Sequence, residues 1–306
     1  MLNAMIPTLQ NQKILITSVG LDGEKIDQIT SLEKPEIMVF PGMYVLTALD
    51  TLEMISGSYE VLRYLPLSSP LGKMVLVRIL EKSLCLVGGP STNKEMLEAL
   101  QFIDDFGFQQ ILIDGAFSRK ANAVISDAII YVVGSSYHID PAKVIEDALI
   151  DIDFFTLAKS SLEDNPSFND ELIQVIDSHH HLTTYTVSST LEIDHFFLSL
   201  PEDIVEIYLP KALTTSFAIG WMKERQKRPL GLVLKDPFKI QVTRNIFNKL
   251  HLYKEDIRYL HQVEVIAVCV NPYSVYQRDM THYDLKYELQ RYLKIPVFNV
   301  KEDSYE

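Results

Sequence analysis

Cysteine is scarce in this sequence of 306 residues. The chain has two, Cys85 and Cys269, and each lies in an apolar run where a thiol ordinarily acts as a small buried hydrophobe. Two isolated cysteines exclude a disulfide framework. We therefore expect both thiols to be buried and unpaired, in a protein of a reducing compartment.

Positive charge is also in short supply. The 28 lysines and arginines are outnumbered by 41 aspartates and glutamates, which leaves a formal net charge of −13. Such a chain repels a phosphate backbone or an anionic lipid surface. The composition disfavours general nucleic-acid binding unless a local basic patch overrides the net charge, and we expect neither nucleic acid nor membrane among the partners.

Long uncharged apolar runs are lacking. The most apolar stretch, residues 74–87, is interrupted by Arg78, Glu81 and Lys82, whereas a membrane-spanning helix needs ~18 uncharged residues. The N-terminal residues have neither the basic region nor the cleavage site of a signal peptide, so we expect a cytoplasmic protein. With 47% hydrophobic and 23% charged residues, the chain has the composition of a folded protein.

The sequence does contain an alternation of short Ile- and Val-rich runs with helix-length segments. Continuous apolar runs suit strands covered on both faces, and strands separated by helices indicate a parallel sheet. The predicted fold class is α/β, with a mostly parallel, doubly wound, Rossmann-like or nucleotide-binding-like sheet in two α/β halves. The predicted strands cover residues 14–16, 36–40, 74–78, 84–87, 111–113, 128–133, 204–209, 231–234, 265–270 and 296–300, and the predicted helices 93–106, 214–223, 238–250 and 283–293.

A less regular stretch with three consecutive histidines separates the two halves. At roughly 150 residues per domain, the length agrees with two domains or one large one. We predict an N-terminal α/β domain over residues 1–155, an irregular connecting segment over 156–200 and a C-terminal α/β domain over 201–306. His179 to His181 are interpreted as a polar loop, because consecutive side chains point in different directions and no carboxylate or cysteine pair lies at ligand spacing.

In an open parallel sheet, ligands bind at the carboxyl ends of the strands. The first such place runs from Thr17 to Asp27, where backbone amides near two glycines at a helix start would attract an anion. However, Glu24 follows Gly23 where a phosphate loop has lysine, which excludes an ordinary phosphate loop. The acidic side chains would help to hold Mg²⁺, an amino group or a partner's basic side chain. A tight turn with a solvated acidic helix start is the alternative.

The second place is Gly88 and Gly89, which follow the strand predicted over residues 84–87. Ser91 or Thr92 is available there as a helix N-cap. A plain strand-to-helix turn is the alternative.

The third place is Asp114, directly after the strand predicted over residues 111–113. Nucleotide-binding α/β proteins hold Mg²⁺ or a water at this position, and Arg119 lies nearby for an anionic group. The alternative is a loop cap in which Asp114 pairs with Arg119. Because all these residues follow predicted parallel strands, we expect Asp22, Glu24, Asp114 and Arg119 to converge.

Two further strand ends, residues 133–136 and 271–274, carry short polar groups that specify no reaction. No catalytic residue can be named from the sequence. Asp114 and Glu24 are the candidate metal ligands if Mg²⁺ is bound. The candidate ligand-binding residues are Thr17, Ser18, Gly20, Asp22, Gly23, Glu24, Asp27, Gly88, Gly89, Ser91, Asp114, Gly115, Arg119, Asn271 and Ser274.

Several segments together resemble a known family, the small subunit of the reactivating factor of lysine 5,6-aminomutase, or a divergent relative of it. The resemblance covers most of the chain outside residues 150–200. Its segments are Ile16-Thr17-Ser18-Val19-Gly20-Leu21-Asp22-Gly23-Glu24-Lys25-Ile26-Asp27, Lys34-Pro35, Ser69-Pro70-Leu71-Gly72, Val87-Gly88-Gly89-Pro90-Ser91, Ile113-Asp114-Gly115-Ala116-Phe117-Ser118-Arg119-Lys120 and Val270-Asn271-Pro272-Tyr273-Ser274.

The resemblance implies a reactivase, a non-catalytic accessory subunit that acts with an ATPase partner. Its client would be an adenosylcobalamin-dependent aminomutase of amino-acid fermentation whose cobalamin has been damaged. The alternative is an Mg²⁺-dependent nucleotide hydrolase or transferase with a divergent phosphate loop. A nucleotide with Mg²⁺ is the one cofactor that the sequence suggests. We expect no haem, flavin or structural zinc, and the dinucleotide fingerprint G-x-G-x-x-G is absent.

Overall fold

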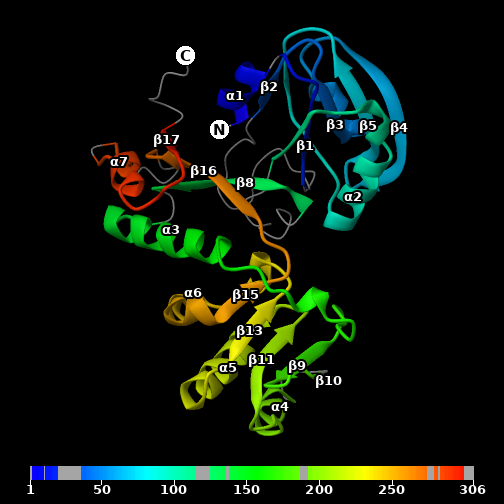
Figure 1. Cartoon of the computed structure of the whole chain (residues 1–306). Helices are drawn as coiled ribbons and strands as arrows, with labels where there is room; N and C mark the ends of the chain where they lie inside the picture. Colours follow the sequence, from blue (N-terminus) through cyan, green and yellow to red (C-terminus); the bar gives the residue numbers. More distant parts are fainter. Residues whose placement is uncertain are drawn as a thin grey trace. The chain divides into compact units, whose positions relative to one another are not determined.

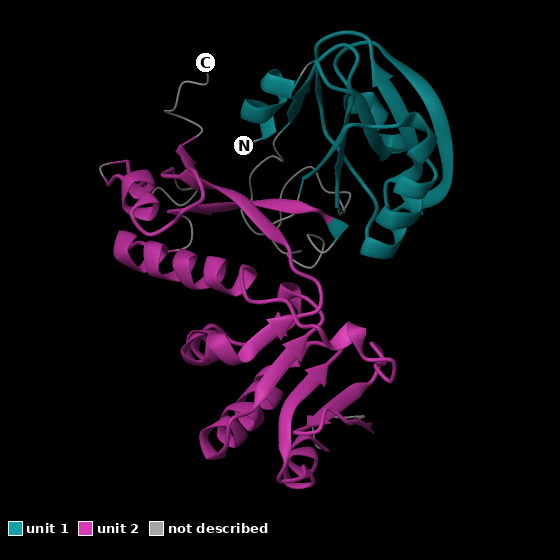
Figure 2. Cartoon of the chain, in the orientation of Figure 1, with its two compact units in different colours: residues 1–125 teal, residues 126–306 magenta. Residues whose placement is uncertain are grey.

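The computed structural model describes residues 2–9, 11–19, 36–114, 125–135, 138–186, 192–273, 279–281 and 283–299. The chain forms two compact units, residues 1–125 and residues 126–306 (Figure 2). The predicted site residues that lie outside the described residues are Gly20, Asp22, Gly23, Glu24, Asp27, Gly115, Arg119 and Ser274.

Unit 1 is built on a five-stranded sheet with the strand order β4-β5-β3-β1-β7 (Figure 1). β1 pairs in parallel with β3 on one side and β7 on the other, whereas β5 is antiparallel to both β3 and β4. A separate antiparallel pair is formed by β2 and β6. The strands are β1 Ile14–Ser18, β2 Ile37–Val39, β3 Tyr44–Ala48, β4 Tyr59–Ser69, β5 Gly72–Ile79, β6 Ser83–Cys85 and β7 Gln110–Asp114.

Both faces of the interior strand β1 are buried, which explains its uninterrupted apolar sequence. Ile14 and Ile16 pack into one hydrophobic cluster and Leu15 into another. Cys85 belongs to the first cluster, and burial raises the pKa of its thiol to about 12. The helical segments of unit 1 are α1 Leu2–Met5, η1 Ile6–Leu9, η2 Leu49–Met54, α2 Asn93–Gln101 and η3 Asp104–Phe106.

Unit 2 contains a second five-stranded sheet, ordered β10-β9-β11-β13-β15, and a three-stranded sheet, ordered β17-β16-β8. The three-stranded sheet is parallel throughout. In the larger one, β11, β13 and β15 are parallel and β9 is antiparallel to β10 and β11. The strands are β8 Ala128–Gly134, β9 Ile173–Asp177, β10 Leu182–Tyr185, β11 Ile204–Leu209, β12 Leu213–Thr214, β13 Gly231–Leu234, β14 Ile240–Gln241, β15 Ile257–Tyr259, β16 Glu264–Asn271 and β17 Val297–Asn299.

The helices of unit 2 cover one face of each sheet. Phe196 of α4, Trp221 of α5 and Leu250 of α6 pack on the larger sheet in one hydrophobic cluster, and α3 and α7 pack with the three-stranded sheet in another. Cys269 of β16 is buried. The helical segments are α3 Pro141–Phe155, η5 Leu162–Asp164, α4 Ile193–Leu198, α5 Thr215–Lys227, η7 Pro237–Lys239, α6 Arg244–Leu250, η8 His251–Asp256 and α7 Leu285–Gln290.

The predicted α/β class is confirmed, but both five-stranded sheets are mixed rather than mostly parallel. In unit 1, the chain folds back from Ser69 to Gly72, which are paired, and Gly72 adopts a positive φ of 94°. This tight turn makes β4 and β5 an antiparallel hairpin. Residues 156–200, expected to be an irregular connection, contain β9, β10 and α4 of unit 2. Among the described residues, no helix is long and apolar enough to cross a membrane.

Candidate functional site

The carboxyl edge of β1 and β7 brings two of the predicted site segments together. Ser18, the last residue of β1, lies in register with Asp114, the last residue of β7. Beyond them, the Val19 amide donates to the Asp114 carbonyl at 3.1 Å. Because the two strands are parallel neighbours, their last residues lie at the same edge of the sheet.

The Gly88-Gly89 segment packs against the same edge. The Gly89 amide donates to the Ser18 hydroxyl at 3.1 Å, and that hydroxyl donates to the Val87 carbonyl at 2.7 Å. A Cβ on Gly89 would lie 1.7 Å from the Ser18 carbonyl oxygen, so no residue with a side chain fits there without backbone movement. The structure therefore joins three of the predicted segments at one place.

Buried hydroxyl groups hold this edge together. Thr17 Oγ1 donates to the Leu46 carbonyl at 3.0 Å. Thr47 Oγ1 accepts from the Gly88 amide at 2.9 Å and lies 2.6 Å from Thr51 Oγ1. Thr17 and Ser18, predicted to bind a ligand, thus donate to backbone carbonyls in this structure. Sequence reasoning missed Thr47, although a threonine at the end of an apolar strand was a signal for it.

Asp114 places a carboxyl group at this edge. It is partly exposed, and the loss of hydration that comes with its position raises the pKa of its carboxyl. A nearby cation would stabilise the ionised form. Among the described residues, no group of three or more His, Cys, Asp or Glu side chains could hold a metal ion, and the other predicted ligand, Glu24, lies outside them. The expected convergence with Asp22, Glu24 and Arg119 stays a prediction.

The start of α2 lies directly after this edge. Thr92 is the N-cap and forms a capping box with Glu95, in which the Thr92 side chain accepts from the Glu95 amide at 3.2 Å. The Ser91 amide donates to the Glu95 carboxylate at 3.1 Å. Glu95 therefore neutralises part of the positive helix N-terminus, where an anion would otherwise be attracted.

In unit 2, the other two predicted strand ends lie next to each other. Gly134 of β8 pairs with Asn271 of β16, and the Ser135 amide donates to the Asn271 carbonyl at 3.2 Å. A Cβ on Gly134 would lie 2.3 Å from that carbonyl oxygen. Asn271 Oδ1 accepts from the Tyr273 amide at 3.2 Å, so this predicted ligand residue shapes its own loop.

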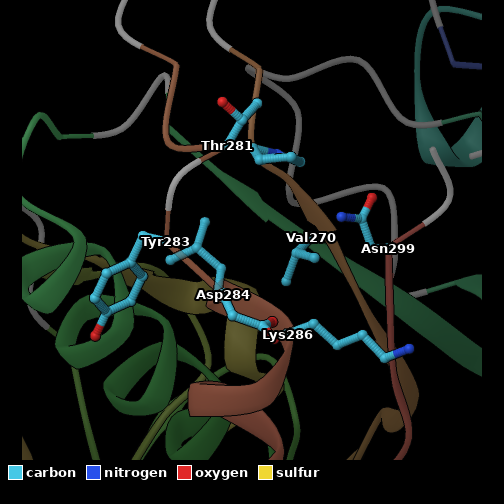
Figure 3. Close-up of a pocket in the computed structure, with 8 residues that line it drawn as sticks. Val270, Thr281, Tyr283, Asp284, Lys286 and Asn299 are labelled. Carbon is cyan, nitrogen blue, oxygen red and sulfur yellow. The ribbon is translucent and has the colours of Figure 1, made fainter. Parts of the chain in front are cut away.

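A small hollow of about 230 Å³ lies at the ends of β16 and β17 (Figure 3). In the view, Tyr283 and Asp284 lie on one side and Asn299 on the other. Asp284 is the N-cap of α7 and accepts from the Tyr287 amide at 2.9 Å. The lining residues are Val270, Pro272, Thr281, Tyr283, Asp284, Leu285, Lys286 and Asn299.

The three histidines form a tight turn between β9 and β10. The amides of His179 and His181 both donate to Asp177 Oδ1, at 2.8 and 2.9 Å, and His180 has a positive φ of 64°. His181 Nδ1 lies 3.1 Å from Asp177 Oδ2. These bonds agree with the predicted polar loop.

No protein-family model, no curated protein and no solved structure matches the chain.

Proposed function

We propose that the chain is an accessory protein that helps to reactivate an adenosylcobalamin-dependent amino-acid aminomutase, acting with an ATPase partner in the cytoplasm. The proposal starts from the resemblance of its ordered motifs to the small reactivase subunit. The observation that carries it is the assembly of three of those motifs at one sheet edge. Gly89 bonds Ser18 across 71 residues of chain, and Asp114 lies in register with Ser18.

The described hydroxyl groups of this edge favour a scaffold over a nucleophile. Thr17 and Ser18 donate to backbone carbonyls, so activating either of them would first break a bond that joins two segments. Both hydroxyl groups link β1 to the backbone of a neighbouring segment. The proposal includes a nucleotide-binding-like strand arrangement only for the three parallel strands β1, β3 and β7.

The test is reconstitution. An aminomutase inactivated by damaged cobalamin is mixed with this chain, the ATPase subunit, Mg²⁺-ATP and fresh adenosylcobalamin, and its turnover is followed. The proposal expects recovery that needs both proteins and ATP. Asp114→Asn should weaken the recovery, whereas Asp104→Asn, which changes an exposed carboxyl of the same unit, should not. No recovery beyond the ATPase subunit alone would overturn the proposal.

One observation favours the alternative, a Mg²⁺-dependent nucleotide hydrolase or transferase. Asp114 has a raised pKa at a strand end where nucleotide-binding proteins place a metal ligand. Incubating the chain by itself with ATP or GTP and Mg²⁺ separates the two functions. Steady turnover that disappears in Asp114→Asn and persists in Asp104→Asn would favour the enzyme.

A further inference from the structure

The larger sheet of unit 2 carries a cavity on the face away from its helices. Side chains alternate across this sheet: Ile207 and Leu232 pack with α4, α5 and α6, whereas Tyr208 and Val233 pack with Leu162 on the opposite face. The cavity has a volume of about 470 Å³, within the usual range of small-ligand sites, roughly 300–1,000 Å³. Its lining residues are Lys159, Ser160, Ser161, Leu162, Asp164, Asn165, Ile176, His180, Glu206 and Arg258.

Hydrogen bonds fix the walls of this cavity. The Ser160 amide donates to the Tyr259 carbonyl at 2.7 Å, and the Tyr259 amide donates to the Ala158 carbonyl at 3.0 Å, which attaches the 158–160 segment to the edge strand β15. Asn165 Nδ2 donates to the His180 carbonyl at 3.4 Å. Segments far apart in the sequence thus form a cavity that exists before any ligand binds.

Glu206 and Arg258 place opposite charges on the sheet side of the cavity. Arg258 Nη1 lies 2.8 Å from Glu206 Oε1, and the two side chains are 44% and 17% exposed, respectively. Gly231 leaves room for the glutamate, since a Cβ there would lie 3.1 Å from Glu206 Oε1. Each group uses one atom in this pair. Within the described part of the chain, Glu206 Oε2 and Arg258 Nε and Nη2 have no hydrogen-bond partner.

The Glu206 and Arg258 atoms outside this pair define the kind of ligand that would complement the cavity. The Glu206 side chain is 17% exposed, and burial raises the pKa of its carboxyl while Arg258 and His180 oppose that effect. Lys159 and Asp164 add one charge of each sign to the lining. A ligand of one sign would meet repulsion from half of these groups. A ligand with both an ammonium and a carboxylate group satisfies both sides of the pair.

We propose that this cavity binds a small zwitterion of the amino-acid type, with its ammonium group on Glu206 and its carboxylate on Arg258. Two neighbouring hydrogen-bonding groups of opposite charge, each with unused atoms, are the feature that selects such a molecule. The site lies in unit 2 and is separate from the edge at Ser18 and Asp114. The binding experiment tests this site independently of the proposed reactivase role.

The experiment is titration calorimetry of the full chain with each of the twenty L-amino acids. For each amino acid that binds, the matched carboxylic acid without the amino group and the matched amine without the carboxyl are titrated as well. We expect at least one amino acid to bind with a Kd below about 1 mM and each single-charge analogue to bind at least about tenfold more weakly. Arg258→Gln and Glu206→Gln should each weaken binding at least about tenfold.

Arg225→Gln is the matched control, because it breaks another Arg–carboxylate pair of unit 2, with Asp256 at 2.8 Å, that does not line the cavity. It should bind as the unchanged protein does. If Glu206→Gln fails to fold, as judged by circular dichroism, the half-exposed Arg258 carries the test. The proposal is overturned if no amino acid binds at 10 mM, if Arg258→Gln binds normally, or if a carboxylic acid binds as well as its amino acid.

Discussion

The Ser18 hydroxyl lies between the Gly89 amide, from which it accepts a hydrogen bond at 3.1 Å, and the Val87 carbonyl, to which it donates at 2.7 Å. One buried side chain therefore satisfies a donor and an acceptor of a segment some seventy residues further along the chain. Loss of this hydroxyl would leave two buried backbone groups unsatisfied. The contact makes the turn at Gly88 and Gly89 part of the sheet edge.

Gly89→Ala should destabilise unit 1 strongly. The added Cβ would lie 1.7 Å from the Ser18 carbonyl oxygen and 2.7 Å from its carbon, so backbone must move. We expect a loss of about 3 kcal/mol in the free energy of unfolding, measured by urea denaturation. Gly42→Ala is the control, because a Cβ there meets nothing within 4 Å and only the positive φ of 89° opposes it. It should cost about 1 kcal/mol. Equal losses would show that the close approach at Gly89 is relieved cheaply.

Thr47→Val removes a hydroxyl while keeping the shape of the side chain. The Gly88 amide then loses its acceptor at 2.9 Å, and Thr51 loses a partner at 2.6 Å. Because these groups are buried, we expect a loss of about 1–3 kcal/mol in unfolding free energy. Thr183→Val, at an exposed position of β10, should change stability by less than about 0.5 kcal/mol. Similar effects at the two positions would contradict the role of Thr47.

The Cys85 thiol should resist labelling in the native protein. Burial raises its pKa to about 12 from 9.0, so almost no thiolate exists at pH 8, and reagent has no access. An Ellman assay should show slow reaction in the native Cys269→Ala variant and fast reaction in guanidinium. The unfolded chain loses this proton near pH 9 while the folded chain keeps it, so Cys85 lowers stability as the pH rises above about 9. Cys85→Ala should reduce that alkaline decline, and rapid native labelling would refute the assigned burial.

Asp153 links α3 to η8. Burial opposes its ionisation, but bonds from Lys254 and from His251 Nε2, the latter at 2.8 Å, lower the pKa of the Asp153 carboxyl overall. Its contribution to stability is therefore present above the unfolded-state pKa near 4 and is lost as the pH falls through the lower folded-state value.

Asp153→Asn should lower Tm at pH 7, by an amount equivalent to about 0.5–1 kcal/mol for a partly exposed pair. The difference from the unchanged protein should shrink as the pH falls below about 4. Glu146→Gln, which changes an exposed partner of Lys143 on the same helix, is the control and should have a smaller effect. A Tm difference that stays constant down to pH 2.5 would contradict the electrostatic origin.

Much of the fold follows from local sequence. The apolar runs in β1 and β13 predicted strands because both faces of those strands are buried. The runs in β7, β8, β11 and β16 also predicted strands, although part of one face is exposed at Ile111, Val132, Val205 and Ile266. Gly107, expected at the end of the helical segment that follows residue 93, has the positive φ of 61° that a C-cap position favours. The hairpin of β4 and β5 was missed because β4 is largely exposed and its turn uses Gly72 without an Asn-Gly pair.

The site was only partly predictable for a similar reason. Asp22, Glu24, Asp114 and Arg119 were expected to converge because parallel neighbours share a carboxyl edge. The last residues of the two strands, Ser18 and Asp114, lie in register, and the convergence of the other side chains stays a prediction. The place of Thr47 depends on which strand lies beside β1, and no local pattern encodes that order. Glu206 and Arg258 are 52 residues apart and meet through the pairing of three strands, a relation that sequence spacing does not contain.

The position of β1 between β3 and β7 also affects the synthesis of the protein. β1 leaves the ribosome first, yet its neighbour β7 comes last among the strands of that sheet, and Lys13 bonds Gln109 across 96 residues. At a synthesis rate of about 5–20 residues per second, the wait is roughly 5 to 20 seconds. During that time Leu15 and Ile16, fully buried in the finished protein, are exposed on an unpaired strand edge. Nascent chains stalled before residue 110 should therefore be aggregation-prone and should bind chaperones that recognise extended apolar segments.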